Sequence, residues 1–234
     1  MKRTFSAGAL LVVAALFCTS CKFVSYKGEN FSRGGVLVAT DSLVTRSFEV
    51  DDFKSLSVNV PCDIRFTPGP KSVSVHAAGN LVDALAFEVD STGCLGISTP
   101  GYRQILNART VVFTISAPTL EGLTIKGASD VELEGNLVAD SFMIDISGAG
   151  DVEADSIKAS QVSVNVRGAG DIDIENLDCD SLSVNVSGAG DCTFAGRADS
   201  ADIDVRGAGD VDISELKVQI LSKSVKGAGT VRTE

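Results

Sequence analysis

The sequence predicts an all-β fold, namely a parallel β-helix (a solenoid) with coils of about 20 residues. The first observation is a short phrase, Gly-Ala-Gly-Asp or a close variant, that occurs six times in the C-terminal half. The second is its fixed period, with 21, 20, 20, 19 and 20 residues between successive first glycines. The third is an alternation of apolar and polar residues on both sides of each phrase, which is typical of strands with one buried face.

Aligning the six copies on their first glycine places apolar residues in columns. Two positions before the glycine stand Ile125, Ile146, Val166, Val186, Val205 and Val225. Four positions after it stand Val131, Val152, Ile172, Cys192, Val211 and Val231. Each repeat therefore contains two short strands joined by a corner. The period is too short for a strand–helix–strand unit, which needs about 30 residues. We therefore expect the coils to stack directly, about 4.8 Å apart.

The glycines of the phrase are expected to form the corners, because glycine adopts positive φ without steric cost. They are Gly127, Gly148, Gly150, Gly168, Gly170, Gly188, Gly190, Gly207, Gly209, Gly227 and Gly229. We expect the intervening alanine to point into the crowded corner. We expect the aspartate to accept hydrogen bonds from backbone amides of its own turn. A second corner is predicted near Gly135 and Asn136 and at the equivalent positions of later repeats, followed by an inward residue such as Leu137.

The region before the repeats is predicted to continue the same architecture in a less regular form. Residues 46–119 are expected to form degenerate coils and residues 120–234 the regular ones. The segment Ser55–Val60 matches Ser181–Val186 of the regular part. Residues 80–85 are expected to form a helical turn. The irregular stretch 80–109, which contains Tyr102, Arg103 and Arg109, is either a cap over the N-terminal end or a binding loop.

The first 20 residues are predicted to be an export signal, since Lys2 and Arg3 precede a short apolar run. The run is too short to span a membrane. The small and apolar residues directly before Cys21 resemble a bacterial lipobox, which implies cleavage at this point and acylation of Cys21. Residues 21–45 would then be a lipidated tether that attaches the chain to a membrane. The alternative is an ordinary secretory signal in which Cys21 has no role.

The residue after Cys21 bears on localisation. Lys22 stands where an aspartate would resemble an inner-membrane retention signal, so the outer membrane of a Gram-negative bacterium is expected. The acidic residues that resemble a surface-export signal are missing from the residues just after Cys21. The sequence leaves both the periplasmic face and the cell surface open.

The chain is strongly acidic, with a formal net charge of −11. Cleavage before Cys21 removes Lys2 and Arg3 and takes the net charge to −13. Because nucleic acids are polyanions, this charge argues against a nucleic-acid partner. The sequence does not indicate an oligomeric state.

Four cysteines remain in the mature chain besides Cys21. Cys179 and Cys192 stand in inward columns and are expected to be small buried hydrophobic residues. A disulfide between Cys62 and Cys94 is left open, since an exported protein with an even number of cysteines often forms such bonds.

A column of aspartates is the first candidate site. It comprises Asp130, Asp151, Asp171, Asp191 and Asp210. Stacked carboxylates are able to bind Ca²⁺, which prefers several oxygen ligands. The interpretation preferred here is that each aspartate stabilises its corner, so no metal and no cofactor are predicted.

The sequence offers no catalytic constellation. His76 is the single histidine, and it lies in a predicted strand. No long insertion interrupts residues 120–234 to build a cleft. We therefore expect a protein that is not an enzyme, although β-helix folds include polysaccharide lyases and hydrolases.

Residues 46–234 resemble the GIN domain family, described as a head domain of auto-transporter adhesins. The resemblance rests on Arg46–Val58 and on the phrase Ser-Gly-Ala-Gly-Asp at Ser147–Asp151 and Ser187–Asp191. It implies a right-handed β-helix in an exported lipoprotein, without catalytic residues to transfer. The expected function is adhesion or interaction within the cell envelope, with a protein or polysaccharide ligand. The alternative is a carbohydrate-binding or polysaccharide-processing protein, and a purely structural role also stays open.

Overall fold

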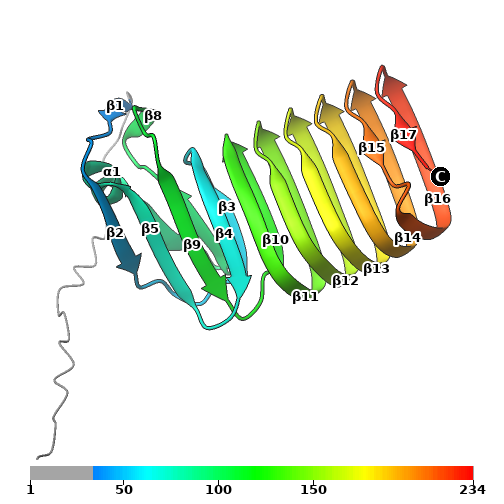
Figure 1. Cartoon of the computed structure of the whole chain (residues 1–234), viewed down its shortest axis with the longest axis horizontal. Coiled ribbons are helices and arrows are strands. Elements are labelled where there is room, and N and C mark those ends of the chain that lie inside the picture. Colours follow the sequence, from blue (N-terminus) through cyan, green and yellow to red (C-terminus); the bar gives the residue numbers. More distant parts are fainter. Residues whose placement is uncertain (1–33, 234) are drawn as a thin grey trace, which may run out of the picture. The chain divides into compact units, whose positions relative to one another are not determined.

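The computed structural model describes residues 34–233 and shows a parallel β-solenoid. Its regular part consists of β10 (Gly122–Gly127), β11 (Ser129–Gly148), β12 (Val152–Gly168), β13 (Ile172–Gly188), β14 (Cys192–Gly207), β15 (Val211–Asp212), β16 (Leu216–Gly227) and β17 (Val231–Arg232). These strands stack in chain order, as the green-to-red ribbons of Figure 1 show. The prediction of a solenoid with coils of about 20 residues is confirmed.

The register between coils is the one that the aligned glycines predict. Ile146, Val166, Val186 and Val205 stand opposite one another in successive strands. All four side chains are buried, and so are their neighbours in the other inward columns. The result is one continuous apolar core, since apolar residues at alternate positions of each strand face the interior.

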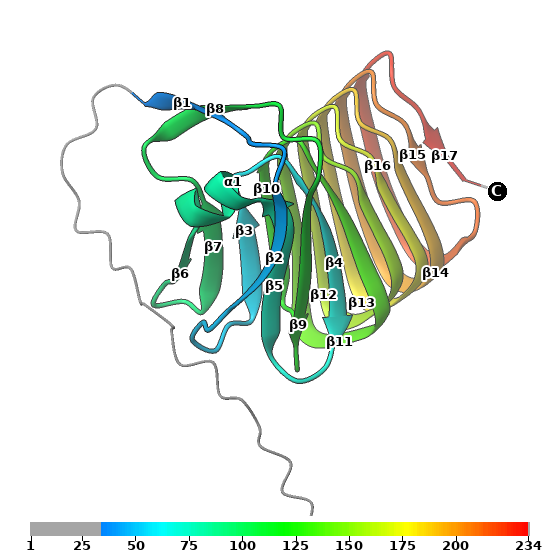
Figure 2. The ribbon, with the colours of Figure 1, turned by 60° about the vertical axis from the view of Figure 1, so that its left-hand side comes forward.

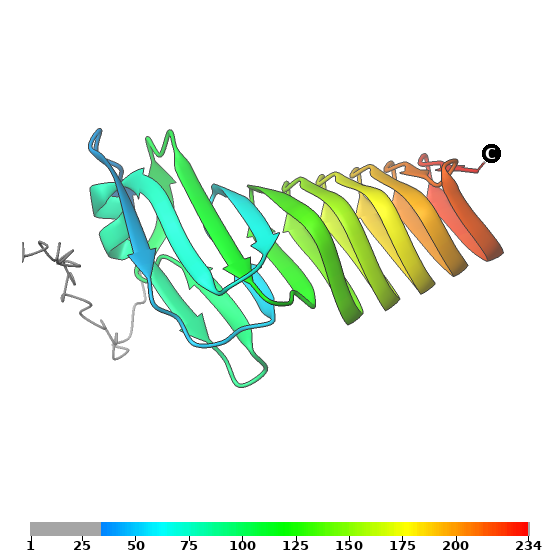
Figure 3. The same ribbon diagram turned by 60° about the horizontal axis from the view of Figure 1, so that its bottom comes forward.

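The second corner differs from the prediction of two separate strands. β11, β12 and β13 each run through it as one curved strand, which Figure 3 shows as a folded ribbon in each coil. Backbone pairing with the neighbouring coils continues on both sides of the bend, with register shifts between Leu133 and Asn136 and between Ile174 and Leu177. Gly135 adopts a φ of 77° at this bend. In β11, a bulge with positive φ at Gly135 therefore turns the strand without ending it, whereas β12 and β13 turn at the same corner without a residue of positive φ.

Two further coils precede the regular ones, and their order in space differs from their order in the chain. One coil contains β3 (Ser55–Val58) and β4 (Cys62–Pro68), and the other contains β7 (Cys94–Ser98) and β9 (Val111–Ala117). β3 pairs with both β10 and β7, and β4 pairs with both β11 and β9, all in parallel. The coil formed first in the sequence is therefore the inner one.

The N-terminal end also contains antiparallel strands, which the prediction of degenerate coils did not include. β5 (Ser72–Ala78) is antiparallel to both β9 and β2 (Leu43–Phe48), and β6 (Ala86–Val89) is antiparallel to β7. The turn around Gly69 reverses the chain after β4, so β5 runs in the opposite direction. Figure 2 shows β2, β5 and β9 in front of β6, β7 and β3.

A short helix covers this end, where the sequence predicts a helical turn. α1 (Gly79–Ala84) packs on β2 and β5 and buries Leu81 and Val82. β1 (Gly35–Val38) and β8 (Tyr102–Leu106) form a separate parallel pair. Within residues 34–233, no helix is long and apolar enough to cross a membrane.

Candidate functional site

The glycine corners bring successive coils into backbone contact. A Cβ atom at Gly188 would lie 2.0 Å from the carbonyl oxygen of Gly168, and φ of Gly188 is +153°. A Cβ at Gly190 would lie 2.2 Å from the carbonyl oxygen of Gly170. Both positions therefore require glycine, the first for its conformation and both for the close approach of the preceding coil.

The alanine between the two glycines does not point into the corner, contrary to the prediction. Ala149, Ala169, Ala189 and Ala208 are exposed, whereas the glycine after each of them is buried. The glycine occupies the crowded position because only a residue without Cβ fits against the carbonyl group of the coil before it.

The aspartates form a ladder between coils, which corrects the prediction that each aspartate caps its own turn. The Oδ1 atom of Asp151 accepts a hydrogen bond from the backbone N–H of Asp171, with an N···O distance of 3.1 Å. Asp171 accepts in the same way from Asp191 at 2.8 Å, and Asp191 from Asp210 at 2.9 Å. The last acceptor is Asp210, which binds both the N–H and the hydroxyl of Thr230 at 2.8 Å. Each carboxylate therefore fastens its coil to the next.

The ladder belongs to a strongly acidic face, formed by the outward residues that follow each glycine corner. This acidic face comprises Asp130, Glu132, Glu134, Asp151, Glu153, Asp155, Asp171, Asp173, Glu175, Asp191, Asp210 and Asp212. Basic partners occur at its two ends, where Arg65 contacts Glu132 at 3.0 Å and Arg232 contacts Asp212 at 3.8 Å. In between, Glu153 and Asp173 stand side by side in register.

The alternative that the aspartate column binds Ca²⁺ depends on several carboxylates being free to coordinate one ion. In the described part of the chain, no group of three or more His, Cys, Asp or Glu side chains is placed to hold a metal ion. Oδ1 of Asp151, Asp171, Asp191 and Asp210 already binds an amide of the next coil. Asp130 lies outside the ladder, in register with Asp63 of β4.

A second lateral face carries mainly neutral polar residues, formed by the outward positions before each glycine corner. This Ser/Asn face includes Ser163, Asn165, Ser183 and Asn185, which are half-buried and stand in register between β12 and β13. Two ion pairs on the same face join residues of different columns, so aligning the repeats does not reveal them. Arg167 reaches back to Asp145 of the preceding coil at 2.5 Å, and Arg206 contacts Asp204 two residues away. The pair between Arg167 and Asp145 could have been predicted from the sequence, because opposite charges stand about one period apart there.

The irregular stretch 80–109, for which the sequence leaves a cap and a binding loop open, contains most of α1 and a segment that lines a hollow. Its first part forms α1 over the N-terminal end. Its segment from Ser98 to Ile105, which includes most of β8, lines a hollow of about 760 Å³ together with Asn59, Pro61, Lys126 and Gly127. Tyr102 is 41% exposed there, and Arg103 and Gln104 are also exposed. Arg109 is exposed but does not line the hollow.

The described cysteines are free thiols. Cys62, Cys179 and Cys192 are buried and Cys94 is half-buried. The disulfide between Cys62 and Cys94 is not formed; the Cys62 thiol instead lies 3.7 Å from the hydroxyl of Ser129. Burial raises the pKa of both Cys62 and Cys192 to about 12, so these thiols stay protonated and unreactive near neutral pH. Cys21 lies outside the described residues.

His76, the single histidine of the sequence, lies on β5, as the sequence predicts for a strand residue. Its Nδ1 atom shares a hydrogen bond with the Thr45 hydroxyl on β2 at 2.8 Å, across the antiparallel pair. This contact ties the two strands together. The role that this geometry supports for His76 is to hold β5 against β2.

Comparison with known proteins identifies the family. The family model described as "putative auto-transporter adhesin, head GIN domain" matches residues 52–234. This chain belongs to the GIN domain family. The resemblance carried by Ser147–Asp151 and Ser187–Asp191 is thereby confirmed. No curated protein matches the sequence.

Solved structures share the fold. The GIN-domain chain is similar to a "putative adhesin" from Bacteroides fragilis, with 26% identity and a TM-score of 0.71 over 85% of this chain and 100% of that one. A "putative lipid binding protein" from Parabacteroides distasonis has 18% identity and a TM-score of 0.53, covering 86% and 100%. A "putative adhesin" from Parabacteroides merdae has 14% identity and a TM-score of 0.53, covering 85% and 99%. The last two support the fold alone.

Proposed function

We propose that this GIN-domain chain is a non-catalytic outer-membrane lipoprotein whose solenoid mediates adhesion or interaction within the cell envelope. The observation that carries the proposal is the alignment of outward residues in successive coils, which creates two long lateral faces of repeating polar groups. Repeat proteins use such extended faces to bind macromolecules. Membership of a family described as adhesins supports the same role.

A protein ligand fits the lateral faces better than a sugar. Ligand sites for small organic groups depend on apolar and aromatic side chains. From Ser129 to Thr233 the sequence contains no Trp or Tyr, and Phe142 and Phe194 are buried. The acidic face instead offers closely spaced carboxylates, which favour a basic protein surface.

Carbohydrate binding is the second candidate, and one observation favours it. The hollow beside β8 contains the exposed ring of Tyr102 next to Arg103 and Gln104. An aromatic ring with neighbouring hydrogen-bond donors is suited to a sugar. This ligand would bind at the N-terminal hollow and leave the lateral faces free.

Three variants of the soluble chain distinguish these sites. Glu153→Gln combined with Asp173→Asn neutralises the middle of the acidic face, Asn165→Ser combined with Asn185→Ser alters the Ser/Asn face, and Tyr102→Ala removes the ring from the hollow. The unmodified chain and each variant are tested against envelope proteins, peptidoglycan and polysaccharides. We expect protein binding that weakens with salt and with the acidic-face variant. Loss of polysaccharide binding in Tyr102→Ala alone would select the second candidate, and degradation of any polysaccharide would refute a non-catalytic role.

Lipid attachment is tested independently of ligand binding. Cys21→Ala removes the only thiol that the lipobox-like signal places at the cleavage point. We expect the variant to lose incorporation of a labelled fatty acid and to leave the membrane fraction, because acyl chains supply the anchoring free energy. Retained labelling would show that Cys21 is not the acylation site.

A further inference from the structure

The C-terminal end of the solenoid is uncovered within the described residues, in contrast to the N-terminal end. β16 pairs with β14 along one edge, and no strand of residues 34–233 pairs with its other edge. A row of backbone N–H and C=O groups is therefore available to another extended chain. At the opposite end, α1 buries Leu81 and Val82 over the first coils.

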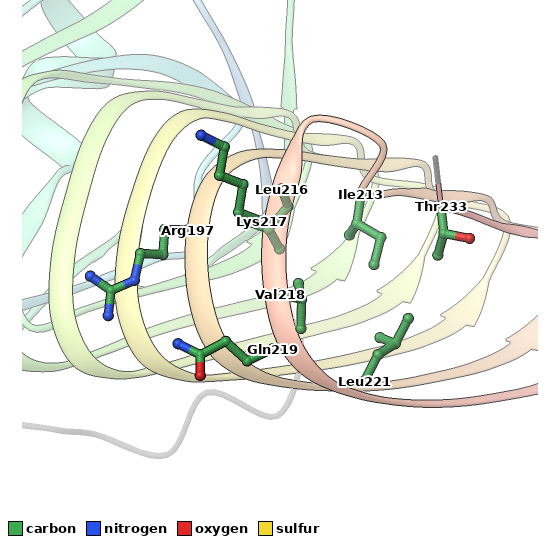
Figure 4. Close-up of a pocket in the computed structure, with 8 residues that line it drawn as sticks. All are labelled: Arg197, Ile213, Leu216, Lys217, Val218, Gln219, Leu221 and Thr233. Carbon is green, nitrogen blue, oxygen red and sulfur yellow. The ribbon is translucent and has the colours of Figure 1, made fainter.

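The last coil exposes apolar side chains that belong to inward columns of the core. Leu221 and Val225 occupy inward columns but are 39% and 42% exposed, whereas their partners Ala201 and Val205 on β14 are buried. A hollow of about 540 Å³ opens beside Leu221, and Figure 4 shows Ile213, Leu216 and Val218 among the residues that line it. Apolar residues in an exposed terminal coil are unusual, because the end repeats of solenoids normally present polar outer faces.

The last coil also reverses the charge of the chain. From Leu216 to Thr233 the sequence contains Lys217, Lys223, Lys226 and Arg232 and no acidic residue, in a chain with a net charge of −11. Lys223 stands in the inward column, opposite Ile203 on β14. The terminal row therefore presents an apolar residue, a lysine and a second apolar residue at alternate positions.

We propose that β16 is a docking edge for an extended segment of another protein that carries an acidic residue between two apolar ones. The segment pairs with the free backbone edge of β16, its apolar residues cover Leu221 and Val225, and its carboxylate lies against Lys223. This is strand addition to a sheet edge, in which the backbone provides affinity and alternate side chains provide specificity. The proposal concerns the end of the solenoid and does not depend on adhesion through the lateral faces.

A second copy of this chain fits the same edge poorly. Pairing two identical β16 strands would bring two basic ends together and place Lys223 of both copies in one apolar row. Like charges that lose water in an interface are unfavourable. Charge complementarity therefore selects an acidic partner.

The test uses a peptide copied from Asp180–Gly188, which forms the equivalent part of an inner coil. Its central valine aligns with Lys223 through the column of Val184 and Ile203. One peptide carries Val184→Glu and a matched peptide carries Val184→Lys. Binding of each labelled peptide to the purified chain is measured by fluorescence anisotropy, with the wild type, Lys223→Glu and Lys226→Glu compared. Lys226 lies on the outward column beside Arg206, so its variant changes the net charge equally without altering the inward row.

We expect the glutamate peptide to bind the wild type at least about tenfold more tightly than the lysine peptide. Lys223→Glu should reverse this order, and Lys226→Glu should preserve it. Equal binding of the two peptides, or an order that Lys223→Glu leaves unchanged, would overturn the proposal. So would concentration-dependent dimerisation of the wild type that Lys223→Glu alters, or binding to phosphatidylglycerol vesicles without binding to either peptide. Circular dichroism checks that the variants are folded.

Discussion

At the scale of single residues, the close approach of coils at the glycine corners gives the sharpest prediction. Gly188 and Gly127 both adopt positive φ, +153° and +129°, but a Cβ at Gly127 would meet nothing within 4 Å. We expect Gly127→Ala to lower the free energy of unfolding by about 1–2 kcal/mol through backbone strain alone. Gly188→Ala should lower the free energy of unfolding by about 1–3 kcal/mol more than Gly127→Ala does, because its Cβ collides with the Gly168 carbonyl. Urea unfolding of both variants measures the difference, and equal losses would contradict the close approach.

Cys192 gives a prediction of pH dependence. Burial, with smaller contributions from Asp171 and Asp191, raises the pKa of this thiol from 9.0 to about 12. The unfolded chain therefore releases the thiol proton before the folded chain does as the pH rises. The stability contributed by Cys192 is complete below pH 9 and is lost between pH 9 and 12, at roughly 1.4 kcal/mol per pH unit.

The variant Cys192→Val removes this titration and keeps an apolar residue of the kind found at Val152 and Val211 in the same column. We expect equal melting temperatures near pH 7 and a more stable variant above pH 9. Cys62 is present in both proteins, so its own titration cancels in the comparison. Parallel stability curves up to pH 11 would show that the Cys192 thiol is not buried as described.

The sequence predicts which residues occupy the corners but not how each one is used. The period identifies Gly188, and the alternation identifies the buried Val186 two positions before it. The orientation of Ala189 and the acceptor role of Asp191 depend on the neighbouring coil, about 20 residues away in sequence. An alignment of repeats shows that such residues are equivalent, and leaves open whether a turn bonds to itself or to the next coil.

At the scale of structural elements, the aspartate ladder predicts different roles for two acids on one face. Asp171 accepts the amide of Asp191, whereas Asp173 is exposed and stands in register with Glu153. We expect Asp171→Ala to lower the free energy of unfolding by about 1 kcal/mol, because the amide of the next coil loses its acceptor. Asp173→Ala should be neutral or slightly stabilising, since it removes a like-charge contact. Equal effects in thermal melts would show that the ladder does not contribute.

The same ladder predicts independence from calcium. The carboxylates of Asp151, Asp171 and Asp191 are engaged with backbone amides, and within residues 34–233 no three ligand side chains are placed to hold a metal ion. We expect the same melting temperature with excess Ca²⁺ and with EDTA. A large fall in EDTA would instead assign the aspartate column to a structural metal.

In the elements before the repeats, the period and the alternation of apolar residues predict only part of the strand pairing. These signals identify β3 and β4 as a coil because Ser55–Val60 matches an inner repeat. They do not show that β9 inserts between β4 and the reversed strand β5. Strand direction there depends on one turn and on pairing between distant segments, for which a single sequence contains no repeating signal.

At the scale of the whole solenoid, each coil contacts only its neighbours, so stability depends on position along the stack. Val166 and Val225 belong to the same inward column, but Val166 is fully buried and Val225 is 42% exposed in the last coil. A charge introduced at Val166 would lie between two coils without a partner.

We therefore expect Val166→Asp to unfold much of the solenoid, with a loss of at least about 4 kcal/mol. Val225→Asp should lower the free energy of unfolding far less, because the new carboxylate reaches water at the open end. Circular dichroism during thermal unfolding compares the two variants with the wild type. Similar losses would mean that the last coil is covered in solution, which would identify Val225 as part of a closed interface. A wild-type melt for Val166→Asp would contradict the inward column itself, since a buried unpaired charge cannot leave the core intact.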